Sequence, residues 1–293
     1  LLITTVSRSQ FSNNLKRFAD NVSQNNLLFD HNSSTIKTYL SSNFKRYYRN
    51  TTLSVGFKVQ KLNYSVKSNS SLLPNFDYEN RLSFNRYGFH VGVKGNNEDV
   101  NLFYNVGLRS DADNFLFGSS FFNHVSPSVA LKFYLNDKIF LNTSYGLYYR
   151  MPPMTALGFK ENQISVNKDL KYINSSQIDL GFGYQKNNFE KFSLTSFYKR
   201  YNDYPFSISD QVSIANKGVD FDIYGNENLT SSSSGNTYGL EFFYQRQLYK
   251  KFYGNISYTL FKSEFTSIGN DFIPSSWDTR HIFSMNYGLK MKK

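Results

Sequence analysis

The sequence predicts an all-β protein, an antiparallel up-and-down β-barrel that crosses a membrane. Three observations support this fold: strand-like segments alternate apolar and polar side chains, their connections alternate between short and long, and aromatic residues are abundant. Of the 293 residues, 18% are aromatic, with 23 Tyr, 29 Phe and one Trp, yet the mean hydropathy is −0.50. A barrel with an apolar exterior and a polar lumen gives such a low mean because its two faces cancel.

About twelve segments show the alternation of a half-buried strand, in which every second side chain faces the same side. In 178–185, the residues Ile178, Leu180, Phe182 and Tyr184 are separated by residues that are polar or glycine. The predicted strands are about 1–11, 36–48, 51–63, 85–95, 99–110, 128–136, 138–150, 176–187, 190–201, 236–249, 252–263 and 279–290.

The connections between these strands alternate in length from residue 36 onward. Short ones lie near 49–50, 95–98, 136–138, 187–190 and 249–251, and long ones span about 64–84, 111–127, 151–175, 202–235 and 264–278. A transmembrane barrel gathers its short turns at one rim and its long loops at the other, whereas a soluble sandwich has no such requirement.

Two segments of low strand character are expected in the long loops. Residues 12–35 have mild helical character, and we expect them in a loop or in a short helix within one. Residues 231–234 are four serines, a composition typical of a mobile loop tip.

Composition excludes several other classes of protein. No run approaches eighteen apolar residues, so no helical membrane span is predicted. The absence of cysteine removes disulfides, thiolate catalysis and thiolate metal sites. The four histidines lie in different segments, none at metal-ligand spacing, so we expect neither a metal nor another cofactor. The net charge of +11 favours contact with anionic lipid headgroups, and the scattered Lys and Arg argue against nucleic acid.

Residues 1–293 are predicted to form one domain, because no linker interrupts the strands. The first ten residues lack the basic, apolar and small-residue regions of a signal peptide, and the last segment stops on a basic turn. We therefore expect the sequence to begin inside a longer gene product, and its strands to be part of a larger barrel.

Three stretches are more specific than this succession of strands. Residues 144–159 (SYGLYYRMPPMTALGF) follow a strand to Arg150 and stop at two prolines, which cannot donate to a strand ladder. Residues 237–245 (TYGLEFFYQ) contain a Y-G-x-E-x-x-x-Q string. Residues 273–290 (IPSSWDTRHIFSMNYGLK) lead from a loop into a strand through the only tryptophan.

Together and in this order, the three strings resemble those of TonB-dependent outer-membrane receptors, especially the carbohydrate- and peptide-importing type of Bacteroidetes. The likeness covers about residues 130–293 well, and the first third of the chain by architecture alone. The resemblance implies a barrel of about 22 strands, filled by an N-terminal plug that contacts TonB, with ligand capture by the outer loops.

This sequence departs from that pattern because it shows no plug, no energy-coupling box and no terminal strands. The resemblance therefore implies part of a barrel in the cell outer membrane, surrounded by lipid and lipopolysaccharide, which would reach the TonB complex through a plug absent from this chain. The implied ligand is a small nutrient of the glycan, peptide or siderophore class, and a lipoprotein partner is left open.

Six residues are candidate ligand contacts: Arg150, Glu241, Trp277, Asp278, Arg280 and His281. The last four enter a strand and could face the lumen. In the structural alternative, Asp278 pairs with Arg280 while Trp277 anchors the rim. Glu241 alternates with apolar neighbours and should point into the lumen, towards a plug or a base such as Lys262 or Arg246.

Aromatic residues near the long loops have more than one interpretation. Tyrosines of 198–205 (YKRYNDYP) are expected at the level of the lipid headgroups. Others could stack on sugar rings or pack the loops against one another: Phe115, Phe117, Phe121, Phe122 and Tyr224.

Two other functions remain alternatives, a plug-free porin-like diffusion channel and a surface or soluble β-rich binding protein. An enzyme is not expected. The outer-membrane phospholipase, also a barrel of this size, needs a serine and a histidine paired on the barrel's outer face. The strings around His90 and His281 show no such pair.

Overall fold

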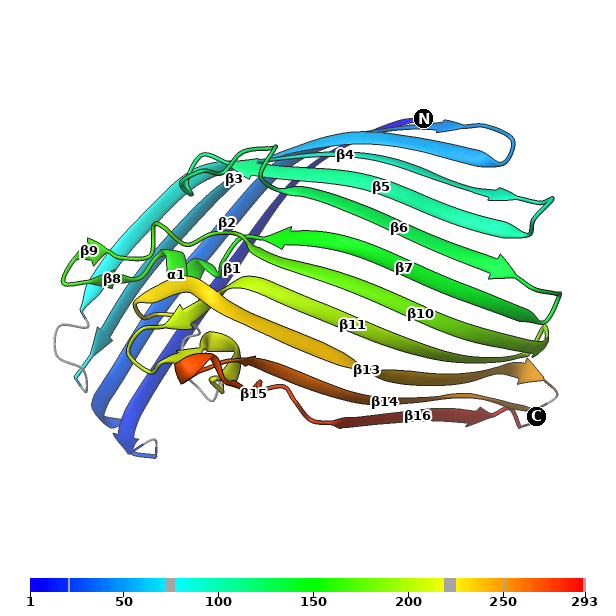
Figure 1. Ribbon diagram of the computed structural model, residues 1–293. Helices are drawn as coiled ribbons and strands as arrows, with labels where there is room; N and C mark the ends of the chain where they lie inside the picture. The colour runs from blue at the N-terminus through cyan, green and yellow to red at the C-terminus, as the bar shows by residue number, and fades with distance from the viewer. Residues whose placement is uncertain (21, 72–76, 219–224, 250, 292–293) are drawn as a thin grey trace.

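The computed structural model describes residues 1–20, 22–71, 77–218, 225–249 and 251–291, and its long strands form one large antiparallel sheet, while β8 and β9 pair separately with each other (Figure 1). The long strands are β1 (Leu2–Asp20), β2 (Asn25–Tyr47), β3 (Thr51–Ser70), β4 (Tyr78–Asn97), β5 (Leu102–Asp113), β6 (Val125–Tyr134), β7 (Ile139–Arg150), β10 (Ile173–Asn187), β11 (Glu190–Ser207), β13 (Leu229–Tyr249), β14 (Phe252–Thr266) and β16 (His281–Leu289). The short elements are α1 (Met154–Leu157), β8 (Lys160–Glu161), β9 (Ile164–Ser165), β12 (Val212–Ser213), η1 (Ile214–Asn216), η2 (Ile268–Asn270) and β15 (Phe272–Pro274).

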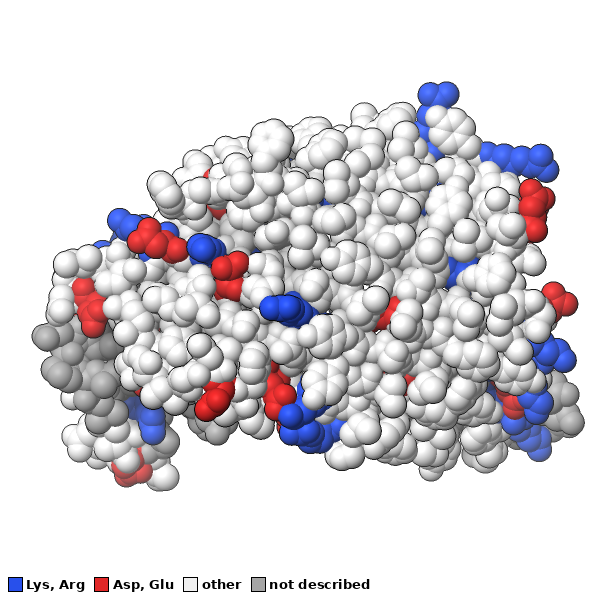
Figure 2. Space-filling view, in the orientation of Figure 1, with Lys and Arg blue, Asp and Glu red and all other residues white. Residues whose placement is uncertain are grey.

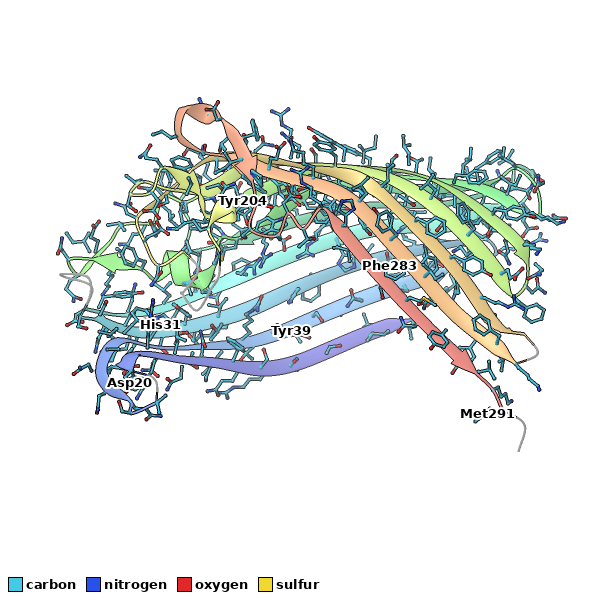
Figure 3. The ribbon with its side chains drawn as sticks, turned by 90° about the horizontal axis from the view of Figure 1, so that it is seen from below. Asp20, His31, Tyr39, Tyr204, Phe283 and Met291 are labelled. Carbon is cyan, nitrogen blue, oxygen red and sulfur yellow. The ribbon has the colours of Figure 1, made fainter. Side chains whose placement is uncertain are left out.

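Each long strand pairs antiparallel with the next along the chain, so the predicted up-and-down order is confirmed. Within the described residues, β1 pairs only with β2, and β16 pairs only with β14. The sheet curves strongly but is open, and these two strands form its edges (Figure 3). The fold is therefore a partial barrel, as the sequence predicts.

From β2 onward, the short turns lie at one end of the sheet and the longer connections at the other (Figure 1). Two turns show why they are tight. The Asn136 Oδ1 accepts hydrogen bonds from the backbone N–H groups of Lys138 and Ile139, each at 2.9 Å. The Asn187 Oδ1 does the same for Phe189 and Glu190. An asparagine that bonds its own turn in this way favours a short reversal of the chain. The predicted alternation of loop lengths is confirmed from β2 onward, but the predicted extent of the 64–84 connection is wrong, because β3 continues to Ser70 and β4 begins at Tyr78.

Two expectations about the loops are wrong. Segment 12–35 contains no helix; it is the β1–β2 hairpin, in which Leu15 lies opposite His31. Residues 231–234 belong to β13, where Ser233 is buried and bonded to Thr266. In both cases the strands continue beyond the apolar band, and their backbone ladders hold residues whose composition suggests a loop.

The two faces of the sheet differ, as two neighbouring rows of cross-strand partners show. The outward row, from β3 to β13, is apolar: Leu53, Val93, Val106, Val129, Tyr145, Ile178, Tyr198 and Tyr238. The inward row, one residue away on each strand, is mostly polar or small: Thr52, Lys94, Asn105, Ala130, Ser144, Asp179, Phe197 and Gly239. This alternation gives an apolar exterior for lipid and a polar lumen.

Most of the face shown in Figure 2 is uncharged, with single charged groups scattered across its centre and others at its two ends. An apolar hollow on the outer face is lined by leucines and phenylalanines of β5 to β13, including Leu141, Leu180 and Leu194. Large apolar side chains exposed over such an area mark a surface that contacts a membrane or another protein. Among the described residues, no helix is long and apolar enough to span a bilayer.

The polarity of the faces reverses on β3 near Gln60. Beyond this point the outward residues are polar, as at Lys61 and Lys67. The inward residues become apolar, and Leu62 and Tyr64 are 2% and 3% exposed. This half of the strand has left the apolar band, and its inner face is covered by the loops described below.

Leu194 and Thr195 are neighbours on β11 that face opposite sides of the sheet. We expect Leu194→Arg to destabilise the barrel in bilayers by about 2–4 kcal/mol, because it places a charge in the lipid-facing band. Thr195→Arg should cost less than about 1 kcal/mol, because it faces the lumen opposite Glu241. Urea titration in vesicles, followed by heat-modifiable gel mobility, measures both variants; equal losses would contradict the assignment of faces.

Candidate functional site

The long connections at one end of the sheet fold together over its inner face. We call this assembly the loop cap; it comprises residues 114–124 and 151–172 and the described parts of 208–228. Figure 1 shows its short elements α1, β8 and β9 at the left of the sheet. The two prolines end β7 as predicted, since β7 stops at Arg150 and Pro153 precedes α1.

An apolar core joins the loop cap to the strands. Ala156 and Leu157 of α1 are 0% and 1% exposed. They belong to one cluster with inward residues of β3 and β4, with the first residue of β13 and with loop residues: Leu62, Tyr64, Val66, Tyr78, Phe84, Leu116, Met151, Phe159, Leu170, Tyr172, Ile214 and Leu229. A Cβ at Gly158 would lie 2.5 Å from the Tyr64 ring, so only glycine allows this close approach. Burial of this size makes the cap a packed structure.

Asn167 connects two loops of the cap and is 1% exposed. Its Nδ2 donates to the backbone oxygens of Ala156 at 2.8 Å and Glu227 at 2.7 Å, and its Oδ1 accepts from the Leu229 N–H at 2.9 Å. Buried backbone groups need partners, and this one amide supplies three. Asn167 therefore fixes loop 151–172 to the segment that enters β13.

A polar network holds loop 114–124 of the cap in place. The Asp113 carboxylate accepts from the backbone N–H groups of Phe115 and Leu116, at 2.8 and 2.7 Å, and from the Tyr172 hydroxyl at 2.8 Å. Burial, followed by the nearby Asp113 charge, raises the pKa of Tyr172. The hydroxyl therefore stays protonated and donates.

His124 stacks on Tyr172, with ring centroids 3.9 Å apart, and its Nδ1 donates to the backbone oxygen of Asp111 at 3.1 Å. Burial lowers the pKa of His124, although the Asp111 oxygen and the Asp113 charge act in the opposite direction. Arg109 binds the Asp111 carboxylate through two nitrogens, at 2.7 and 2.9 Å. The end of β5 therefore contacts the cap through the neutral His124 ring and through the Asp113 carboxylate, while Arg109 neutralises the neighbouring Asp111.

Four predicted site residues lie near the end of β14. The Trp277 Nε1 donates to the Ser263 Oγ at 3.1 Å, and its ring meets the buried Phe265 edge-on at 5.6 Å. The Arg280 Nε lies 3.1 Å from the Asp278 Oδ2, so the predicted ion pair is present. His281 bonds the Tyr258 hydroxyl at 2.8 Å. Because His281 lies opposite Leu260 in an outward row, it faces away from the lumen, contrary to the ligand-contact interpretation.

The other two predicted residues face inward. Arg150 ends β7 opposite Ile173 and is exposed. Glu241 lies between Thr195 and Thr259 on the inner face, as expected. The prediction that Glu241 points towards Lys262 or Arg246 is wrong, because both bases face outward. Lys262 pairs with Glu264, and Arg246 pairs with Glu190. The structure therefore brings Trp277, Asp278 and Arg280 together; His281 follows them directly but faces outward, and Glu241 and Arg150 lie on other strands.

The aromatic residues divide between packing and exposure. Tyr201 and Tyr204 pack on Phe265, at 5.3 and 4.8 Å between ring centroids, so the expectation that they lie at headgroup level is wrong. Phe115 stacks on Phe84 within the cap. By contrast, Phe117 and Phe122 are 93% and 92% exposed, and are therefore free to contact a ligand. Tyr224 lies outside the described residues.

The residues that organise the cap, Asn167, Asp113, Tyr172 and His124, were not among the six candidates. Their partners lie far along the sequence: the Asn167–Leu229 bond spans 62 residues and the Tyr172–Asp113 bond 59. A signal for the cap was nevertheless present in the alternation of Leu62, Tyr64 and Val66 with polar residues. No group of three or more potential metal ligands occurs among the residues that the structure describes.

An open antiparallel sheet with an apolar exterior, short turns at one end and a packed cap at the other defines part of an outer-membrane β-barrel. The model of the family described as TonB dependent receptor-like, beta-barrel, matches residues 3–289, and the chain belongs to this family of outer-membrane transport receptors. No curated protein matches the chain.

Solved structures with the same fold include outer-membrane receptors and transporters. A ferripyoverdine receptor of the outer membrane of Pseudomonas aeruginosa is 13% identical with a TM-score of 0.66, and the match covers 100% of this chain and 42% of that one. The alcaligin receptor FauA from Bordetella pertussis is 14% identical with a TM-score of 0.59, and the match covers 100% of this chain and 48% of that one. The transporter YddB from Escherichia coli is 11% identical with a TM-score of 0.63, and the match covers 99% of this chain and 46% of that one. The chain thus spans less than half the length of these proteins.

We expect Asn167→Ala to loosen the loop cap, because three buried backbone groups lose their partner, at about 1–3 kcal/mol. Limited proteolysis of the folded chain should then cut loop 151–172 faster. Lys168→Ala, at the neighbouring exposed position, is the control and should leave the rate unchanged. An unchanged rate in Asn167→Ala would show that the cap does not depend on this amide.

The cap should also loosen in acid. The pKa of His124 is lower in the folded cap than in the unfolded cap, where it is about 6.5. As the pH falls through about 6.5, His124 therefore takes up a proton more readily in the unfolded cap. The stability of the cap is full above this pH and decreases below it. Hydrogen exchange of 114–124, measured at pH 7.5 and 5.0, should speed up at the lower pH. His124→Gln should remove most of that difference; if it does not, another group is responsible.

Proposed function

We propose that this chain is the barrel region of a receptor that captures a ligand at the loop cap and admits it by TonB-energised uptake. The observation that carries the proposal is the loop cap itself, which is preassembled over the inner face at the long-loop end. Long loops of outer-membrane barrels lie on the extracellular side. A packed cap there presents a defined surface to the outside.

The exposed parts of the cap supply the proposed ligand contacts. Phe117 and Phe122 have exposed rings, and Arg150 adds a positive charge on the inner face at the end of β7 that adjoins the loop cap. Aromatic faces and a guanidinium suit a ligand that combines apolar surfaces with polar groups. The glycan, peptide and siderophore classes all fit this description, and we propose transport of one of them rather than catalysis.

Coupling to TonB requires parts beyond those described. Strands β1 and β16 have one unpaired edge each within the described residues. In lipid, each unpaired backbone N–H or C=O costs several kcal/mol. We therefore infer that further strands pair with both edges in the membrane, and that a plug and TonB act with the completed barrel. Outer-membrane lipid and lipopolysaccharide would surround the apolar band, and a lipoprotein partner remains a prediction.

Uptake of labelled glycans, peptides and siderophores by cells that produce the complete gene product tests the proposal. One class should accumulate, the accumulation should require TonB, and Asn167→Ala should reduce it severalfold while Lys168→Ala leaves it unchanged. Uptake that persists without TonB would instead favour the porin-like channel. Absence of uptake for all three classes would contradict a nutrient receptor.

A further inference from the structure

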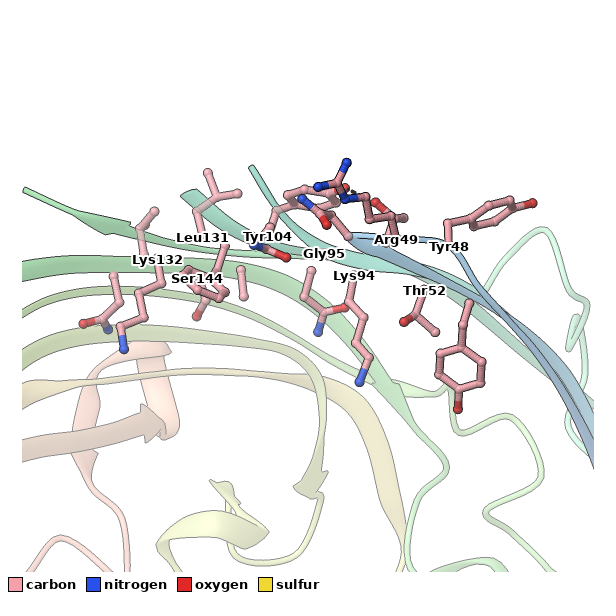
Figure 4. A pocket seen from close by; sticks show the side chains of 18 residues that line it. Tyr48, Arg49, Thr52, Lys94, Gly95, Tyr104, Leu131, Lys132 and Ser144 are labelled. Atoms are coloured by element: carbon pink, nitrogen blue, oxygen red, sulfur yellow. Dashed lines mark hydrogen bonds between the residues drawn. The ribbon is translucent and has the colours of Figure 1, made fainter. Parts of the chain in front are cut away.

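The inner face of the sheet carries lysines that have no carboxylate partner among the described residues. The register places them on the same side as the polar row: Lys58, Lys94, Lys132, Lys191 and Lys199. In Figure 4, Lys94 and Lys132 point to one side of the sheet, whereas Leu131 and Tyr104 point to the other. Several of these ammonium groups lie on aromatic rings instead, as Lys58 does on Tyr39 at 4.3 Å.

Two acidic residues of the same face, Asp111 and Asp179, are already bound by other groups, whereas Glu241 lies between Thr195 and Thr259, four residues along β13 from the partner of Lys191. Asp111 is bound by Arg109. Asp179 accepts from the Ser144 hydroxyl at 2.6 Å and from the Gln177 amide at 2.8 Å. These carboxylates are therefore held in place, and they do not neutralise the inward lysines.

Two lysines converge on one ring near the short-turn end of the sheet. The Lys132 Nζ lies 4.0 Å from the centroid of the Phe140 ring, and the Lys191 Nζ lies 5.5 Å from the same centroid. The two ammonium groups are thus within about 10 Å of each other. They come from β6 and β11, on either side of β7, and we call them the lysine pair.

The ring that holds the lysine pair is itself fixed. Phe140 is 3% exposed and lies flat over Gly183 of the neighbouring strand, where a Cβ would come within 1.9 Å of the ring. Tyr134 packs on Phe140 at 5.6 Å and also faces the Lys132 Nζ, at 4.6 Å. The positive charges are therefore positioned by a rigid aromatic floor.

Neutral groups surround the lysine pair on the inner face. Asn142 lies beside Lys132, and Gln185 and Gln245 lie on either side of Lys191. Glu190, although adjacent in sequence, faces outward and binds Arg246 and Lys186. Two like charges within about 10 Å of each other repel, and an anion placed between them removes this repulsion.

We propose that the lysine pair binds a carboxylate group that enters the barrel. The ammonium groups supply two charge-assisted contacts, and the adjacent amides can donate to the remaining carboxylate lone pairs. The carboxylate belongs either to a free solute or to an acidic side chain of a polypeptide inside the barrel. The site lies at the opposite end from the loop cap and does not depend on the receptor function proposed above.

Calorimetric titration of the full chain in zwitterionic detergent tests this site, with citrate as the free solute, hexaglutamate as the polypeptide and chloride at matched ionic strength as background. At least one of the two should bind saturably. Lys132→Gln and Lys191→Gln should each weaken that binding about tenfold, as expected for loss of one charged contact. Lys138→Gln, in the exposed turn beside β7, is the control and should have no effect.

The two probes separate the sources of the carboxylate: tighter binding of citrate supports a solute, and tighter binding of hexaglutamate supports a polypeptide. Heat-modifiable gel mobility confirms that each variant is folded. The proposal is overturned if neither probe binds above the chloride background, or if Lys138→Gln weakens binding as much as the other two variants.

Discussion

The requirement that every backbone polar group in lipid has a partner governs the rest of this structure. A β-sheet meets it only through hydrogen bonds to neighbouring strands, which forces long antiparallel ladders and fixes the register along each one. Once the register is fixed, every second residue faces lipid and every other one faces the interior. The apolar row through Val106 and Ile178 and the polar row through Asn105 and Asp179 are direct results.

Beyond the apolar band the same ladders serve a different purpose. Lys61 and Lys67 face water there, while Leu62, Tyr64 and Val66 need cover on the inside. The loop cap provides this cover, and Asn167 satisfies three of its buried backbone groups. The loops are therefore stabilised by the same burial that completes the strands, and the rim and the ligand-facing surface fold as one unit.

The sequence was most informative where the pattern is local. The strands, the positions of the short turns and the inward direction of Glu241 could be read from alternation and spacing. The extended strands of 12–35 could not, because the expected order of apolar and polar faces no longer applies outside the lipid. The partners of Asn167 and Tyr172 were equally hidden, because each depends on the packing of loops about 60 residues apart. Lys262 was wrongly predicted to lie beside Glu241. Whether residues on two different strands face the same side of the sheet depends on the register between the strands, which the sequence does not show.

Gly183 has a consequence for the width of the lumen. Because this residue has no side chain, the Phe140 ring lies flat against the wall instead of standing out from it. A larger residue at this position would tilt the ring into the passage and carry the two ammonium groups with it. Gly183, which contributes the least volume to the wall, therefore sets the width of the lumen at this level. It also sets where the ammonium groups of Lys132 and Lys191 meet a solute that passes through the lumen.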